Sequence, residues 1–357
     1  MKAIYTKITE MHEKGRRTVL ATIIKQEGPS PRGIGAKCLI LDDGSLAGTI
    51  GGGILEAQAL NEAIKVFEKG LPIRIKFSLK GTDVAGTDML CGGNVEVFLE
   101  PIPSKGETHL LVFAKAMQIT DQGGVGLLAT VLDQRAWEHG AIPRLVLEKS
   151  GERTGFLTGM HELEDALLKK INQILSLRQP CILPVEDDAG KLVDIFVEPV
   201  MSEPVLYVFG GGHVSRQIVP LASQVGFQVV VIDDRADFAR AEHFPGARDI
   251  CQLPFEGVMT RLPVHELSYL VIVTRGHVHD KNVLAQALKT TADYIGMIGS
   301  RRKRNIIYKK LLEEGFTQKD LSRVHSPIGL DIGAETPEEI AVSIVAQLIK
   351  VRAGLKS

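Results

Sequence analysis

The chain has few cysteines, few aromatic residues and almost no net charge. Its four cysteines are spread over 357 residues and form no CxxC pair, which excludes a zinc ribbon or a thioredoxin-like motif. Aromatic residues make up 5%, so stacking platforms for single-stranded nucleic acid are not expected. The formal net charge of -1 gives no strong field toward DNA, RNA or a membrane surface. We therefore expect neither a nucleic-acid partner nor a membrane partner.

Long apolar runs and common catalytic motifs are also missing. No segment approaches the roughly 18 consecutive apolar residues of a membrane span, and residues 1–7 lack the apolar core of a signal peptide. Few and scattered thiols fit a reducing cytoplasm, which is the expected location. There is no Walker A sequence, no G-x-S-x-G and no Ser/His/Asp signature. The sequence therefore identifies no catalytic acid–base pair.

Length and composition predict two soluble α/β domains. Apolar residues make up 44% and charged residues 24% of the chain, which is ordinary for a globular protein. The polar, proline-bearing segment 198–204 marks the expected boundary, with domains at 1–203 and 204–357. The first domain is predicted as a mixed α/β domain, with strands such as 18–25 and a helix over 54–68. No internal repeat stands out.

The second domain alternates buried apolar strands with helices. Strands are predicted at 205–209, 227–232, 270–274 and 294–298, and a helix at 214–224 lies between the first two. Buried strands that alternate with helices are typical of a parallel sheet. The expected fold is a Rossmann-type domain. Its last helix is expected to start with a capping box at Thr336.

A glycine-rich turn follows the first strand of this domain. Gly210 to Ser215 reads G-G-G-H-V-S, which matches G-x-G-x-x-G except that Ser215 replaces the third glycine. Asp233 ends the second strand, where a carboxylate typically binds ribose hydroxyls, and Arg235 leaves a phosphate contact open. Such a turn binds a pyrophosphate at the start of the next helix. The alternative is a glycine turn without a ligand.

Two further segments lie after later strands of the same sheet. Gly299-Ser300-Arg301-Arg302 opens a basic helix start, which indicates a bound anion or, alternatively, a solvated basic surface. Residues 274–280 carry His277, His279 and Asp280. No fourth ligand completes a metal site, so a loop with Asp280 capping the next helix is the simpler interpretation.

The first domain has two glycine-rich patches. Gly51, Gly52 and Gly53 precede a helix with Glu56 in its first turn. Cys91, Gly92 and Gly93 precede the strand at 95–100. Consecutive glycines indicate close backbone approach to a ligand or only to another strand. Cys91 is interpreted as an exposed thiol near a soft metal such as molybdenum, or as a buried apolar residue.

Seven segments together resemble the XdhC/CoxI family, the accessory factors of xanthine dehydrogenase and related molybdenum hydroxylases. They span nearly the whole chain in the order that the family has. The segments are G-P-S-P-R-G-I-G-A-K, G-S-L-A-G-T-I-G-G-G-I-L-E, M-L-C-G-G-N-V-E-V-F-L-E-P, V-F-G-G-G-H-V-S, V-V-V-I-D-D-R, Y-I-G-M-I-G-S-R-R-K-R and H-S-P-I-G-L-D-I-G-A-E-T-P-E-E-I-A.

The resemblance implies a protein that binds molybdenum cofactor, as molybdopterin or its nucleotide form. It implies sulfuration of the cofactor with a cysteine desulfurase, insertion into an apo molybdenum hydroxylase, and a homodimer. Many members have cysteine after the triple glycine, where this chain has Ile54, which leaves Cys91 as the better thiol candidate. The positions carried over are Gly51, Gly52, Gly53, Glu56, Cys91, Gly92, Gly93, Gly210, Gly212, His213, Asp233, Gly299, Ser300, Arg301 and Arg302.

Two other functions stay open. The first is an NAD(P)-dependent oxidoreductase, since a Rossmann fold with Asp233 permits one, although no hydride-relay residues are evident. The second is a nucleotide sensor that binds a partner protein. A non-catalytic cofactor carrier is the preferred interpretation, with the first-domain glycines and Cys91 facing the metal–dithiolene end of the cofactor.

Overall fold

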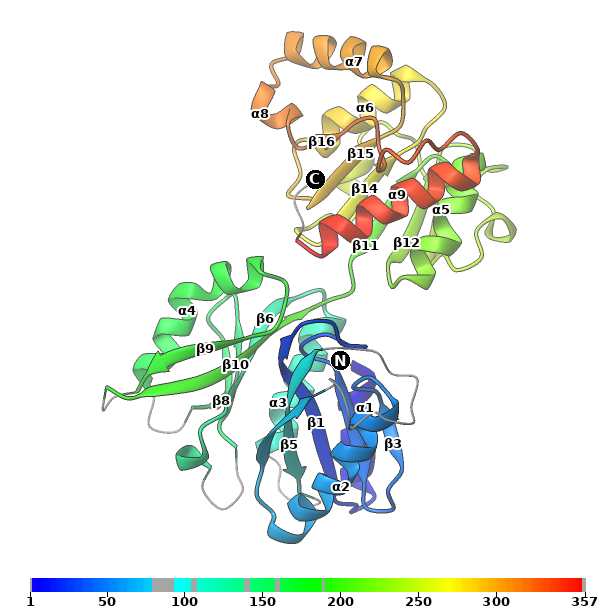
Figure 1. Ribbon diagram of the computed structural model, residues 1–357. Helices are drawn as coiled ribbons and strands as arrows, with labels where there is room; N and C mark the ends of the chain where they lie inside the picture. The colour runs from blue at the N-terminus through cyan, green and yellow to red at the C-terminus, as the bar shows by residue number, and fades with distance from the viewer. Residues whose placement is uncertain are drawn as a thin grey trace. The chain divides into compact units, whose positions relative to one another are not determined.

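The structure is a computed structural model that describes residues 2–78, 93–103, 108–137, 142–157, 161–187 and 190–354. The chain forms two compact units, Met1–Ser202 and Glu203–Ser357 (Figure 1). The sequence-based boundary lay one residue later. None of the helices in these residues is long and apolar enough to cross a bilayer.

The first half of the N-terminal unit, here called copy one, forms a five-stranded antiparallel sheet. Its strand order is β3-β2-β1-β5-β4. The elements are α1 (Lys2–Glu13), β1 (Thr18–Glu27), β2 (Lys37–Leu41), β3 (Leu46–Gly48), α2 (Gly53–Lys69), β4 (Ile73–Ser78) and β5 (Asn94–Ile102).

The second half, copy two, has the same order of elements and the same sheet. Its strand order is β8-β7-β6-β10-β9, again antiparallel throughout. The expectation that the chain contains no internal repeat was therefore wrong at the level of the fold. The elements are α3 (Thr108–Asp121), β6 (Val125–Val131), η2 (Gln134–Ala136), β7 (Arg144–Glu148), β8 (Arg153–Phe156), α4 (His161–Ser176), β9 (Cys181–Glu186) and β10 (Leu192–Met201).

Three apolar layers hold the N-terminal unit together. Helix α2 covers one face of the first sheet, and α4 covers one face of the second. The remaining faces of both sheets share a core with α1 and α3, in which the rings of Tyr5 and Phe113 stack at 4.6 Å. Alternating strand residues supply both faces of each sheet, because successive side chains point to opposite sides.

The C-terminal unit has a six-stranded parallel sheet in the order β13-β12-β11-β14-β15-β16. Helices α5 and α9 cover one face, and α6 and α7 cover the other (Figure 1). This is the strand order of a Rossmann fold, as the sequence predicts. The elements are β11 (Val205–Phe209), α5 (His213–Gln224), β12 (Gln228–Asp233), η3 (Ala241–His243), β13 (Asp249–Gln252), η4 (Val258–Arg261), β14 (Ser268–Ile272), α6 (His277–Ala287), β15 (Tyr294–Met297), α7 (Arg301–Glu313), α8 (Gln318–Leu321), β16 (Val324–His325) and α9 (Pro337–Arg352).

Candidate functional site

Three helices begin at one edge of the parallel sheet. Strands β11, β14 and β15 are neighbours in the sheet, and each is followed directly by a helix, α5, α6 or α7. The chain crosses from one side of the sheet to the other between β11 and β14, which is where ligands bind in such folds. The unpaired N–H groups of three helix starts therefore gather at this edge, where they favour an anion.

The Gly210 turn is shaped by its neighbours. Gly210 has φ +109°, and a Cβ there would lie 2.5 Å from the carbonyl oxygen of Val273. A Cβ on Gly211 would lie 2.4 Å from the carbonyl oxygen of Phe238. Ser215, in place of the third glycine, donates a hydrogen bond to the carbonyl of Gly210. Two glycines of this turn are thus required by packing.

Gly212 differs from the two glycines before it. An added Cβ at Gly212 would meet nothing within 4 Å. The residue is the N-cap of α5 and makes no side-chain cap hydrogen bond, and His213 after it is exposed. The first N–H groups of α5 are therefore open to a ligand.

Asp233 is buried and is fully engaged within the chain. One carboxylate oxygen accepts the N–H of Gly211 at 2.7 Å, and both oxygens accept bonds from the Arg235 guanidinium at 3.0 and 3.1 Å. Burial raises the pKa of Asp233, but the bonds from Arg235 and Gly211 outweigh it and hold the pKa below its usual value. The Arg235 guanidinium stacks over the Phe238 ring at 3.4 Å. In this arrangement Asp233 holds the glycine turn in place.

The basic helix start contains an ion pair with a buried carboxylate. The Lys303 ammonium pairs with Asp280, whose side chain is fully buried and also accepts the Thr274 N–H and hydroxyl at 3.1 and 2.6 Å. Burial raises the pKa of Asp280, although Lys303 and Thr274 oppose the shift. A Cβ on Gly299 would lie 2.7 Å from Cδ of Lys303, so glycine leaves room for this side chain.

Of the other three cations of that turn, one bonds to a residue that the structure describes and two do not. Ser300 caps α7 by accepting the N–H of Lys303, and Arg304 donates to the carbonyl of Ser326 at 3.1 Å. Arg301 and Arg302 are exposed and make no hydrogen bond or ion pair with the described part of the chain. Two of the four cations are thus available to a ligand at the α7 start.

Helix α6 begins earlier than the sequence suggested. It starts at His277, with Gly276 as N-cap at φ +89°, so His277 and His279 belong to the helix and not to a loop. Asp280 lies in the first turn and bonds back to Thr274, so it is not the N-cap residue. Within the described ranges no group of three or more His, Cys, Asp or Glu side chains could hold a metal ion.

In copy one the glycine-rich segments lie against each other. A Cβ on Gly51 would lie 3.3 Å from Cβ of Pro31, and one on Gly93 would lie 2.4 Å from the carbonyl oxygen of Pro29. The segment 28–33 therefore contacts both patches. Cys91 and Gly92 lie outside the described residues.

Glu56 is committed to the triple-glycine turn. Its carboxylate accepts the Thr49 hydroxyl at 2.6 Å and the N–H groups of Ile50 and Gly52 at 3.3 and 3.0 Å. The turn itself has φ values of +134°, +72° and +54° at 51–53, which L side chains rarely adopt. Glu56 thus stabilises a backbone shape that only glycine adopts without strain.

A cavity of about 220 Å³ lies where β1 and β4 end and β5 begins, next to Gly93. The sequence predictions missed it, because its lining residues come from three strands that are distant in the chain. Polar and apolar side chains both line it: Lys25, Gln26, Glu27, Lys76, Phe77, Ser78, Asn94, Val95 and Glu96.

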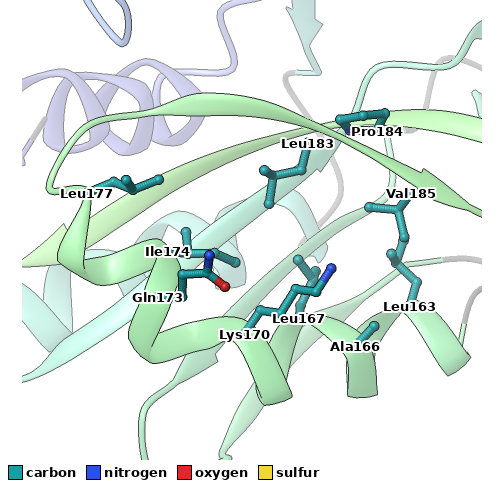
Figure 2. A pocket seen from close by; sticks show the side chains of 10 residues that line it. All are labelled: Leu163, Ala166, Leu167, Lys170, Gln173, Ile174, Leu177, Leu183, Pro184 and Val185. Atoms are coloured by element: carbon teal, nitrogen blue, oxygen red, sulfur yellow. The ribbon is translucent and has the colours of Figure 1, made fainter.

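A second groove, of about 180 Å³, lies in copy two between α4 and β9 (Figure 2). It is mostly apolar and was not expected from the sequence. Its walls include Leu167, Ile174 and Leu177 on the helix side and Leu183, Pro184 and Val185 on the strand side.

The described cysteines do not carry an activated thiol. Burial raises the pKa of Cys38 to about 12, and it also raises the pKa of Cys181 and Cys251. Thiolates are the reactive form of cysteine. Of the four cysteines, only Cys91 therefore remains as a candidate.

Comparison with known proteins gives two relatives that align over nearly the whole chain and one partial match. The chain is 26% identical over 99% of its length to a Bacillus subtilis protein named as a probable xanthine dehydrogenase subunit, 98% of which is covered. It is 21% identical over 95% of its length to the molybdenum cofactor insertion chaperone PaoD from Escherichia coli, 84% of which is covered. It is 25% identical to the uncharacterized protein YqeB from Escherichia coli, but the match spans only 46% of that protein.

A solved structure and two family models agree with these relatives. A crystal structure from Bacillus halodurans, described as a xanthine dehydrogenase, superposes with a TM-score of 0.72 at 26% identity and covers 97% of this chain and 95% of its own. The model of the XdhC and CoxI family matches residues 11–78, and the model of the XdhC Rossmann domain matches residues 206–348. The chain therefore belongs to the XdhC and CoxI family.

Proposed function

We propose that this protein binds molybdenum cofactor and assists its insertion into a molybdenum hydroxylase of the xanthine dehydrogenase type. The observation that carries the proposal is the set of three helix starts at one sheet edge, with an open Gly212 and unpaired Arg301 and Arg302. The relative named as a molybdenum cofactor insertion chaperone supports the same role. Sulfuration with a cysteine desulfurase and a homodimeric state belong to the proposal as well.

The phosphate-bearing end of the cofactor is the part that suits the C-terminal unit. Helix starts and arginines both attract phosphate, and the arginine fork matches its oxygens. In the proposal, Gly212 and His213 at the α5 start and Gly299 to Arg302 at the α7 start contact the phosphates. The glycine segments of copy one and Cys91 contact the pterin and metal end.

The competing NAD(P) oxidoreductase needs a free carboxylate at Asp233. Both oxygens of Asp233 are instead bonded to Arg235 and the Gly211 N–H. A ribose diol would have to displace charge-assisted bonds, which cost more to break than neutral ones. The geometry thus favours recognition of phosphate over recognition of ribose.

The test is retention of cofactor by the purified full chain. The protein is incubated with molybdopterin, its nucleotide form, NAD or NADP, then desalted, and the retained molybdenum and pterin are measured. We expect retention of the nucleotide form, and transfer that activates an apo molybdenum hydroxylase. Retention of NAD or NADP alone, with no retained pterin, would refute the proposal.

A charge variant with a matched control locates the phosphate contact. Arg301→Gln with Arg302→Gln should weaken retention of the nucleotide form at least tenfold. Lys309→Gln with Lys310→Gln removes the same charge from exposed positions of the same helix and should leave retention unchanged. Equal losses in both double variants would indicate only a general charge effect.

A further inference from the structure

Two pairs of strand segments match residue by residue between the copies of the N-terminal unit. Val19–Ile24 on β1 reads VLATII, and Leu127–Leu132, on β6 and just after it, reads LLATVL. On β5 and β10, residues 95–102 read VEVFLEPI and residues 193–200 read VDIFVEPV. The sheet registers agree with this alignment. Thr22 faces Lys37 and Phe98, and in copy two Thr130 faces Arg144 and Phe196.

The contacts between the copies are reciprocal. Lys37 of copy one pairs with Glu198 of copy two, and Arg144 of copy two pairs with Glu100 of copy one. Both pairs are buried and occupy matched positions in the two sheets. Such reciprocity is what a two-fold dimer shows at its interface. The N-terminal unit is thus a duplicated module whose copies pack like the two halves of a dimer.

The duplication supplies an internal control for the function of single residues. Glu164 in copy two accepts the N–H of Leu157 at 3.0 Å, much as Glu56 accepts that of Ile50 at 3.3 Å. A glutamate that accepts a backbone N–H shortly before the helix is thus common to both copies. The triple glycine is not, because with Glu56 aligned to Glu164 the sequence of copy two has Gly159-Met160-His161 in its place.

The cavity beside Gly93 also has polar side chains that copy two lacks at the matched positions. Lys76 and Asn94 line it on β4 and β5. Their register-matched counterparts on β9 and β10 are Pro184 and Leu192. The fold that both copies share therefore does not need polar side chains at these positions. We interpret those of copy one as serving a function other than folding.

We propose that copy one alone holds a ligand site, formed by the triple-glycine turn, the segment 28–33 and the cavity lined by Lys76 and Asn94. At about 220 Å³ the cavity is smaller than the roughly 300–1,000 Å³ of sites for drug-sized ligands, so it takes one end of a larger molecule. The identity of that end rests on the proposed function: it is the fused polar ring system of the pterin. Amide and ammonium donors match its ring nitrogens and carbonyl oxygen. Copy two has the same fold without this site, and it completes the apolar core that both copies share.

The test exchanges residues between the copies. Asn94→Leu gives copy one the residue that copy two has at the matched position, and Leu192→Asn makes the reverse change. Binding of a stable pterin and of molybdopterin is measured by fluorescence quenching, with the melting temperature as a control. N94L should weaken binding at least tenfold with little change in melting temperature, and L192N should leave binding unchanged.

A second pair of variants tests the glycine turn. The two alanine substitutions should cause the same backbone strain, one inside the proposed site and one outside it. Gly52 and Gly123 have φ values of +72° and +75°, and neither has an atom within 4 Å of an added Cβ. Gly52→Ala and Gly123→Ala should therefore lower the melting temperature equally, while only G52A loses pterin binding. If N94L and G52A bind pterin as the natural chain does, the site in copy one is refuted. If the natural chain binds no pterin, both this site and the proposed function fail.

Discussion

At the scale of single residues, the glycines of the C-terminal turn have two different reasons to be glycine. Gly210 lacks room, since an added Cβ would lie 2.5 Å from the Val273 carbonyl oxygen and 3.0 Å from Cα of Thr274. Gly212 has room on all sides and an extended backbone with φ -79°. The first glycine is therefore needed for the fold, and the second leaves space for whatever approaches the start of α5.

This difference predicts opposite outcomes for two alanine variants. Gly210→Ala should lower the free energy of unfolding by about 3 kcal/mol or more, because backbone strain and overpacking each cost about 1–3 kcal/mol. Gly212→Ala should change it by no more than about 0.5 kcal/mol and should instead weaken phosphate binding. Urea unfolding and ligand titration distinguish the two effects. A stable G210A variant would contradict the geometry of the turn.

Asp233 gives a prediction for pH dependence. Its pKa in the folded chain is lowered, so it contributes stability above the unfolded value of about 3.9, and that contribution is lost as the pH falls through the folded pKa. Asp233→Asn should therefore be less stable than the natural chain at pH 7, and the difference should shrink in acid. Denaturant unfolding from pH 7 down to pH 3 measures it. A difference that stays constant over this range would contradict the charge-assisted role.

At the scale of elements, sequence patterns predict four of the six parallel strands and most helix starts, but not β13 and β16. The segment from β11 to β12 was predicted because buried apolar runs flank a glycine turn. The start of α6 was missed because its N-cap is Gly276, which has no capping side chain, and its first residues are histidines. Helices α1 and α3 were not anticipated. Their apolar faces pack against each other and against both sheets, which come together only in the folded unit.

Candidate residues were easier to name than to interpret. Gly299 and Asp233 were selected as ligand contacts, yet the structure ties both to side chains of the same unit, Lys303 and Arg235. Asp280 was expected as a helix cap and is instead the buried partner of Lys303. These pairings depend on which loops the sheet brings together. The residues next to each position in the sequence do not predict that. Cys91 remains a prediction outside the described residues.

The capping box of α9 was predicted from sequence and is confirmed. The Thr336 hydroxyl accepts the N–H of Glu339, and the Glu339 carboxylate accepts that of Thr336. Thr336→Ala should lower the free energy of unfolding by about 1 kcal/mol. Thr317→Ala breaks the box of the much shorter α8 and should cost less, because fewer core contacts depend on that helix. Thermal unfolding of both variants gives the comparison, and equal losses would contradict it.

At the scale of the whole molecule, the duplication explains four of the buried charges of the N-terminal unit. Lys37, Glu198, Arg144 and Glu100 are each less than 10% exposed, and every one finds its partner in the other copy. A buried ion pair adds little net stability, but removing one partner is costly. The pairs therefore specify the orientation in which the copies pack, and they add little to the stability of the contact.

This arrangement predicts a symmetric response to mutation. Glu198→Gln and Glu100→Gln each leave one buried cation without a counter-charge and should each cost about 3–5 kcal/mol. Combining Lys37→Met with Glu198→Leu should recover most of that loss, since the charge and its partner leave together. Chemical denaturation of the three variants tests it. A double variant no more stable than E198Q would show that packing and not charge dominates at this position.

The separation of these partners along the chain has a consequence for synthesis. Lys37 and Glu198 are 161 residues apart, so the charge buried early in the chain meets its partner only when the last strand of the unit has left the ribosome. Domains made first normally fold first during translation. Here copy one has to wait, with an apolar face and two charges uncovered, until copy two follows. We expect the nascent first copy to be a substrate for chaperones that bind exposed apolar surface.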